Sequence, residues 1–133
     1  MSPILFYEHY IEHMTTHRIH NTSHRQNHTT KVPAIKVASW NINGVISKTQ
    51  NKLNDPNFIQ RINNHDIVFL METKCSPTKP ITFPNYYTYN LYRRSLKTAK
   101  TESGGITVLC KDIYRKGMKI LSHKSEDYLW IKL

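Results

Sequence analysis

Residues 67–71 read Ile-Val-Phe-Leu-Met, and this run of consecutive apolar side chains stops at the carboxylate of Glu72. A strand that is apolar on both faces belongs inside a sheet that is covered on both sides, as parallel strands usually are. The run therefore predicts a central strand of an α/β domain. Glu72 stands at the carboxyl end of this strand, and Lys74 follows two residues later.

The segment before this run predicts a second strand and a helix. Residues 36–41, KVASWN, alternate in polarity and are rich in strand formers, and NING then supplies turn residues. Asp55 and Pro56 suit the cap and the first turn of a helix, which residues 63–65 would end. The order strand, helix, strand implies a right-handed crossover that makes the two strands parallel neighbours.

The second half of the chain is predicted to be rich in strands. Residues 93–105 form a basic, polar loop that ends on two glycines. The predicted strands cover residues 86–92, 105–110, 118–124 and 127–133. One α/β domain, with its helix early and its strands late, is the expected architecture for a chain of 133 residues.

Residues 1–33 differ in composition from residues 34–133, which we expect to form the domain. They hold six of the eight histidines, and they carry few large apolar residues after Ile19. Such a segment cannot bury a core of its own, so we predict a disordered, His-rich leader. The spacing would also align the histidines on one helical face, and a metal-binding helix is therefore the alternative. The six histidines are His9, His13, His17, His20, His24 and His28.

The charge of the chain favours a polyanionic partner. Lys and Arg number 19 against 9 Asp and Glu, which gives a formal net charge of +10. Strongly basic chains commonly bind nucleic acid, although an ordinary basic domain has the same composition. Cys75 and Cys110 form no CxxC pair, and no apolar run reaches the ~20 residues that span a bilayer. We expect an intracellular protein, and the nucleus is one of the compartments in which it could act.

Polar side chains follow the ends of the two predicted parallel strands. Asn41 and Asn43 end the first strand and Glu72 ends the second, so all three would lie at one edge of the sheet, where open α/β sheets bind ligands. Glu72 could hold Mg²⁺, which often takes only one or two protein carboxylates. Asn41 could donate to a phosphate oxygen, and Lys74 could attract a phosphate. The alternative is an ordinary solvated strand end.

Four blocks taken in order resemble the endonuclease/exonuclease/phosphatase family: SWNING, METKCS, SGGITVLC and the LW of DYLWIKL. METKCS is similar to the abasic-site endonucleases. The last two blocks are most similar to the endonuclease domain of non-LTR (LINE-type) retrotransposons. The resemblance runs from residue 36 to residue 133 and leaves out the leader.

The resemblance implies a Mg²⁺-dependent phosphodiesterase that nicks DNA. Asn41 matches the active-site asparagine of the family, and Glu72 matches the metal-binding glutamate, so both are candidate catalytic and metal-binding residues. Asn43 stands where abasic endonucleases have Asp, and Lys74 matches a lysine near the catalytic centre. Met71 departs from the family, which usually has Gln before the glutamate.

Basic loops supply further candidates for binding nucleic acid, and they support a second, non-catalytic reading. In that reading the chain is a basic fragment that binds nucleic acid weakly, or the product of a pseudogene without a selected role. Arg93 and Arg94 are the candidates in the first loop, which also holds Lys97 and Lys100. Arg115, Lys116 and Lys119 form the second loop.

The family fold is a two-sheet α/β sandwich, and the resemblance covers only its N-terminal half. The later blocks that supply a catalytic Tyr, an Asp-x-Asn pair, a further Asp and a final Asp-His are not matched here, whereas complete domains have about 200–250 residues. Catalytic groups of this kind act as a unit, so we expect a truncated domain that is inactive alone. An exposed apolar face and an open sheet edge would then favour self-association.

Overall fold

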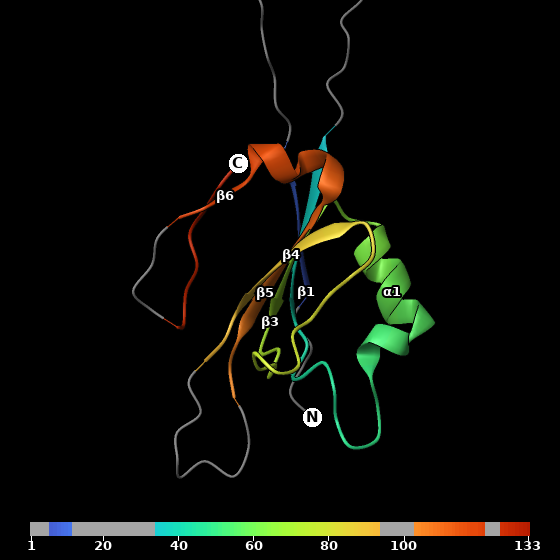
Figure 1. The fold of residues 1–133 in the computed structure, drawn as a ribbon. Helices are drawn as coiled ribbons and strands as arrows, with labels where there is room; N and C mark the ends of the chain where they lie inside the picture. The colour runs from blue at the N-terminus through green and yellow to red at the C-terminus, as the bar shows by residue number, and fades with distance from the viewer. Residues whose placement is uncertain (1–5, 12–33, 94–102, 122–125) are drawn as a thin grey trace, which may run out of the picture.

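The computed structural model of the chain describes residues 6–11, 34–93, 103–121 and 126–133, and it shows a small α/β domain. A five-stranded sheet carries one α-helix on one face, and a separate pair of short strands lies on the other side (Figure 1). The elements in chain order are β1 (Phe6–Ile11), β2 (Ile35–Asn41), η1 (Lys52–Asn54), α1 (Pro56–Asn63), β3 (Ile67–Met71), β4 (Tyr86–Leu91), β5 (Ile106–Lys111), η2 (Asp112–Gly117), β6 (Lys119–Ile120) and β7 (Ile131–Lys132).

The large sheet is mixed, with the strand order β1-β2-β3-β5-β4. β2 and β3 pair in parallel, and every other neighbouring pair is antiparallel. The predicted parallel pairing across the strand-helix-strand unit is therefore confirmed. β3, the apolar run of residues 67–71, lies in the middle of the sheet as its composition predicted.

β1 departs from the prediction of a disordered leader over residues 1–33. It pairs antiparallel with β2, and Phe6 lies opposite Trp40. The stretch FYEHYI is rich in aromatic and β-branched strand formers, and backbone pairing does not require a buried core around each side chain. These six residues, His9 among them, form an edge strand; the other leader histidines lie outside the described residues.

α1 covers one face of the sheet and buries the larger of two apolar clusters. The side chain of Asp55 accepts a hydrogen bond from the N–H of Asn57 at 2.9 Å, and Pro56 follows as the first helical residue, as the sequence predicted. Phe58 packs on Trp40 with ring centroids 4.9 Å apart. This cluster also contains Ala38, Ile42, Val45, Ile62, Val68, Leu70, Ile81, Phe83, Tyr86 and Leu109.

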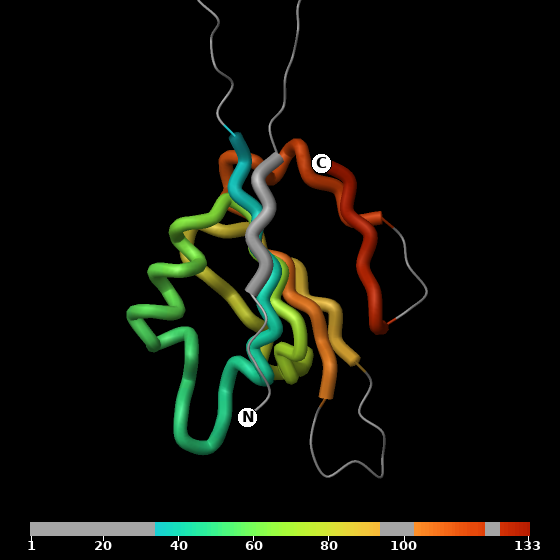
Figure 2. The backbone as a smooth tube through the Cα atoms, turned by 180° about the vertical axis from the view of Figure 1, so that it is seen from behind, coloured from blue at the N-terminus to red at the C-terminus, as the bar shows by residue number. Residues whose placement is uncertain are grey.

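The second face of the sheet was expected to be exposed, and over β2, β3 and β5 it is not. Val37, Ile67, Val108 and Cys110 are buried there together with Met118, which follows η2. The short strands β6 and β7 pack against the same cluster, and Figure 2 shows their segment running along this side of the sheet. The sequence predicted strands over residues 118–124 and 127–133, and the observed β6 and β7 are far shorter. Their packing on this face was not predicted, because the sequence does not show which surface such short strands contact.

One carboxylate fixes the end of the sheet where β3 begins. Asp66 Oδ2 accepts from the N–H of Lys36 at 2.8 Å, and Asp66 Oδ1 accepts from Lys111 Nζ at 3.0 Å. Backbone bonds join the same three residues, from Asp66 N–H to Lys36 O at 2.8 Å and from Lys111 N–H to Asp66 O at 2.9 Å. β2, β3 and β5 are therefore held in register at this end.

The hydroxyl of Tyr86 joins β4 to the end of α1. It donates to the carbonyl oxygens of Ile62 at 2.9 Å and His65 at 2.7 Å, inside the larger cluster. Burial raises the pKa of Tyr86 to about 12, and the negative charges of Asp66 and Cys110 add to the rise. The neutral phenol is thus the form that the fold requires.

We expect the free energy of unfolding to fall between pH 10 and pH 12 and a Tyr86→Phe variant to lack most of that fall. In the unfolded chain Tyr86 ionises near pH 10, so in this interval the folded state binds more protons and stability drops as pH rises, by about 2–3 kcal/mol in total. Urea unfolding at a series of pH values measures the slope. Equal slopes for the two proteins would contradict the role given to this hydroxyl.

Candidate functional site

The parallel pairing of β2 and β3 continues past the ends of both strands. The N–H of Ile42 donates to Met71 O at 3.0 Å, that of Gly44 to Glu72 O at 2.6 Å, and that of Val45 to Thr73 O at 3.1 Å. We call residues 41–45 and 71–74 the carboxyl edge. The structure thus brings Asn41 and Glu72 to the same edge, as the strand order predicted, and the chemical roles assigned to them remain predictions.

Glu72 is held on its other side by the glycines before β5. Its Oε2 accepts from the N–H of Gly104 at 3.0 Å, and the N–H of Lys74 donates to Gly104 O at 2.9 Å. The N–H of Thr73 donates to Gly105 O at 3.2 Å. Oε1 of Glu72 accepts no hydrogen bond from the residues that the structure describes. The half-buried carboxylate is therefore oriented through Oε2.

The two asparagines of the NING turn form a chain of hydrogen bonds with Lys74. The N–H of Asn43 donates to Asn41 Oδ1 at 3.2 Å, and Lys74 Nζ donates to Asn43 Oδ1 at 2.6 Å. The oxygen of the Asn41 amide is thereby engaged, and its Nδ2 group is the donor that it can offer to a phosphate oxygen. Asn43 bonds to both Asn41 and Lys74. Its predicted contact with nucleic acid stays a prediction.

Left-handed backbone conformations concentrate at the carboxyl edge. Asn43, Glu72 and Lys74 have φ of 47°, 54° and 53°, and Asn85 is the only other non-glycine residue of the described ranges with positive φ. Gly104 and Gly105 have φ of 74° and 90°. Such conformations cost energy for residues with a Cβ, and they recur at binding sites. The sequence showed the glycines but not the strained residues around them.

Lys52 is a basic residue of this region that the sequence analysis missed. Its ammonium group donates to the carbonyl oxygens of Ile42 and Gly44, the latter at 2.8 Å. Burial lowers the pKa of Lys52, and the positive charge of Lys74 lowers it further. The two ammonium groups therefore repel each other next to the carboxyl edge, which favours an anion there. No sequence motif marked Lys52, because only the fold of the loop brings it under the turn.

Arg93 and Arg115, one from each predicted basic loop, lie near opposite ends of the sheet. Arg93 follows β4 at the end where the carboxyl edge lies, and its Nε is 3.6 Å from Asp127 Oδ1 in an exposed ion pair. Arg115 belongs to η2, near the other end of the sheet, and lies over the ring of Tyr87 at 4.5 Å. Lys116 and Lys119 are near Arg115 in sequence; Arg94, Lys97 and Lys100 lie outside the described residues.

Metal-ligating side chains are sparse at the carboxyl edge. No group of three His, Cys, Asp or Glu that could hold a metal ion occurs within the described ranges. Glu72, the carboxylate after β3, therefore fits only an ion whose other ligands are mostly water or phosphate oxygens. Mg²⁺ is bound in this way in many phosphate sites, often through a single protein carboxylate.

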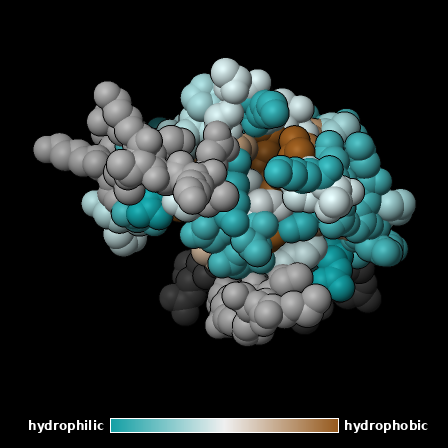
Figure 3. Space-filling model, turned by 90° about the horizontal axis from the view of Figure 1, so that it is seen from below, coloured by the Kyte–Doolittle hydropathy of each residue, from teal (hydrophilic) through white to brown (hydrophobic). Residues whose placement is uncertain are grey.

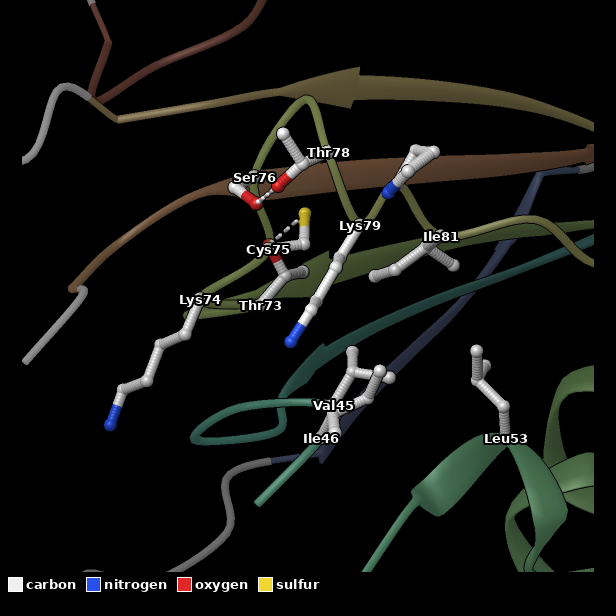
Figure 4. A pocket seen from close by; sticks show the side chains of 11 residues that line it. Val45, Ile46, Leu53, Thr73, Lys74, Cys75, Ser76, Thr78, Lys79 and Ile81 are labelled. Atoms are coloured by element: carbon white, nitrogen blue, oxygen red, sulfur yellow. Dashed lines mark hydrogen bonds between the residues drawn. The ribbon is translucent and has the colours of Figure 1, made fainter. Parts of the chain in front are cut away.

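A cavity of about 270 Å³ lies beside the carboxyl edge (Figure 4). It opens between the loop after β2 and the loop after β3, and Lys74 belongs both to its lining and to the edge. Figure 3 views the molecule from this end and shows a small hydrophobic area surrounded by hydrophilic residues. The lining residues are Val45, Ile46, Leu53, Thr73, Lys74, Cys75, Ser76, Thr78, Lys79, Pro80 and Ile81.

Comparisons with known proteins leave the family undecided. No protein-family model matches the chain, and no curated protein or solved structure matches it. Within the ranges that the structure describes, no helix is long and apolar enough to cross a membrane. The function therefore has to be argued from the residues of the carboxyl edge themselves.

We expect Gly105→Ala to destabilise the fold by roughly 2 kcal/mol or more, because a left-handed residue with a Cβ is strained. The added Cβ would also stand 2.6 Å from Thr73 Oγ1, and Thr73 is almost fully buried. Gly117→Ala is the matched control, since a Cβ there would meet no atom within 4 Å. Chemical denaturation of both variants checks this; equal stability would show that the edge is not strained at Gly105.

Proposed function

We propose that residues 34–133 form part of a Mg²⁺-dependent phosphodiesterase domain of the endonuclease/exonuclease/phosphatase type, of retrotransposon origin, with DNA as its substrate. The observation that carries the proposal is the parallel pairing of β2 and β3, in which Asn41 lies opposite Met71, the residue before Glu72. The backbones of the residues that carry an amide and a carboxylate therefore end at the same edge of the sheet. Their order in the chain is also that of the family motifs quoted above.

The residues of the carboxyl edge would divide the work of binding a phosphodiester. Glu72 would hold the metal through Oε1, since its Oε2 is already bonded to Gly104. Asn41 would donate from Nδ2 to a phosphate oxygen, and Lys74 would add a positive charge. When bound, Mg²⁺ would stabilise the negative charge that develops on the phosphate during cleavage. The protein's own contribution is the fixed orientation of the carboxylate and the amide.

We propose further that this chain alone binds DNA but does not cleave it. Hydrolysis needs groups that activate water and stabilise the leaving oxygen, and the described residues hold no cluster of three His, Cys, Asp or Glu that could act together at a metal. Groups that act as a unit lose orders of magnitude in rate when members are missing. Plasmid nicking in Mg²⁺ by this chain, at a rate well above that of a Glu72→Gln variant, would overturn this proposal of inactivity and strengthen that of a nuclease site.

We expect Glu72→Gln to abolish divalent-cation binding at the carboxyl edge. Mn²⁺ accepts the same oxygen ligands as Mg²⁺, and its paramagnetism broadens the NMR signals of nearby nuclei. Titration of the wild-type chain should broaden the amide signals of Asn43, Gly44 and Glu72 first. Asp112→Asn, at an exposed site in η2, is the control and should leave the broadening unchanged. Broadening that survives in Glu72→Gln, or is absent from the wild type, would exclude the metal site.

A second candidate function is metal-independent binding of nucleic acid through the basic residues. It is favoured because Lys74 and Arg93 lie at the same end of the sheet. We expect the affinity for a DNA duplex in EDTA to fall steeply with salt, because phosphate contacts release counterions. Lys74→Ala should reduce the slope of log K against log salt by about 1. Lys132→Ala, at an exposed position in β7, should leave the slope unchanged. Fluorescence anisotropy measures both slopes. A flat salt dependence would contradict any binding through these lysines.

A further inference from the structure

We propose that the cavity beside the carboxyl edge binds one nucleotide of the substrate strand, next to the phosphodiester held by Asn41 and Glu72. The inference rests on the proposed function, because it treats the strand as nucleic acid. It adds a binding site that does not itself use the metal. Lys74 stands between the two sites, since it both bonds to Asn43 and lines the cavity.

The charge of the lining favours an anionic ligand. Among the residues that the structure describes, the charged ones that line this cavity are Lys74 and Lys79, and none of its described lining residues is acidic. In Figure 4 the side chains of Lys74 and Lys79 both extend from the loop after β3, and both residues line the cavity. A phosphate group bound there would be neutralised by their ammonium groups.

Part of the remaining wall is aliphatic, which a site for phosphate alone would not need. Val45 and Ile81 are almost completely buried and form the floor together with Leu53. Ile46, by contrast, is 52% exposed and borders the opening. Aliphatic walls of this kind suit the faces of a sugar and a base. The volume of about 270 Å³ is also close to the lower end of the ~300–1,000 Å³ of small-molecule sites, so it suits one nucleotide rather than a longer segment.

Hydroxyl groups at the outer wall supply hydrogen-bonding partners for a base or a sugar. Ser76 Oγ and Thr78 Oγ1 lie 2.9 Å apart and can each donate or accept. Deeper in the wall, Thr73 Oγ1 lies 3.2 Å from Cys75 Sγ, so that hydroxyl is already engaged within the protein. A ligand would therefore be oriented from the outer hydroxyls and the lysines.

Both walls of the cavity are fixed by hydrogen bonds, which makes it a formed site rather than a gap between loose loops. The N–H of Val45 donates to Thr73 O at 3.1 Å and joins the first wall to the end of β3. Asn90 Nδ2 donates to Ile81 O at 2.9 Å and joins the second wall to β4. Little ordering of the protein would be needed on binding, and that lowers the cost of binding.

The test is an NMR titration of the full chain in EDTA with thymidine 5′-monophosphate, with thymidine and inorganic phosphate in parallel. We expect the nucleotide to shift the amide signals of Lys74, Thr78 and Ile81, and to bind more tightly than either of its parts. Equal binding of inorganic phosphate would mean an adventitious ion only and would overturn the proposal. Shifts confined to residues remote from the cavity would overturn it as well.

Variants distinguish the cavity from the general positive charge of the chain. Lys79→Ala should weaken nucleotide binding about two- to fivefold, the effect of one exposed ion pair. Thr78→Tyr should fill the cavity and remove nucleotide binding while leaving the binding of inorganic phosphate. Lys132→Ala, which removes an exposed lysine of β7 that belongs to neither basic loop, is the matched control and should change neither. An equal effect of Lys79→Ala and Lys132→Ala would contradict a specific site.

The outcome can be separated from that of the metal site, because the nucleotide titration contains no divalent cation. Loss of Mn²⁺ binding at Glu72 together with retained nucleotide binding would remove the phosphodiesterase proposal and leave a nucleotide-binding cavity. Mn²⁺ binding that depends on Glu72, together with no nucleotide binding at the cavity, would remove only the inference drawn here.

Discussion

The parallel backbone pairing of β2 and β3 is the interaction on which the rest of the structure depends. It places the residue after β3, Glu72, beside the end of β2, and it continues through the turn as far as Val45. The same pairing forms one wall of the cavity, because the bond from Val45 to Thr73 joins the two loops. The metal site, the phosphate contacts and the nucleotide cavity that we propose would all be displaced if this register shifted by one residue.

The carboxyl edge is held in a conformation that its residues would not adopt alone. Left-handed φ values at Asn43, Glu72 and Lys74 are maintained by neighbours that are themselves fixed, chiefly Gly104 and Gly105 before β5. Three strands thus meet at one strained point, and the opposite end of the sheet is fixed by Asp66. Residues that fixed neighbours hold in unusual backbone conformations recur at binding sites, and rigid supporting contacts keep such residues in place.

Much of the fold could be predicted because local signals agreed with the tertiary structure. The apolar run of β3 and the Asp55-Pro56 start of α1 identified their elements directly. β1 and the paired strands β6 and β7 were missed or misjudged for a common reason. Their stability comes from pairing with a partner strand, and a few alternating residues do not show which partner is present. The burial of the second face of the sheet was not predicted for the same reason, because it depends on the contacts of these short strands.

The sequence alone determined which residues could bind an anion or a hard cation, since an apolar strand that ends on a carboxylate, a turn with two asparagines and a basic composition are all local properties. Only the tertiary structure decided which of them meet. Lys74 and Lys52 lie beside the turn at residues 41–44, whereas Arg115 lies near the other end of the sheet. The physical reason is that these residues interact only when they are close in space. Strand register and loop conformation bring them close, and neither can be seen in a local stretch of sequence.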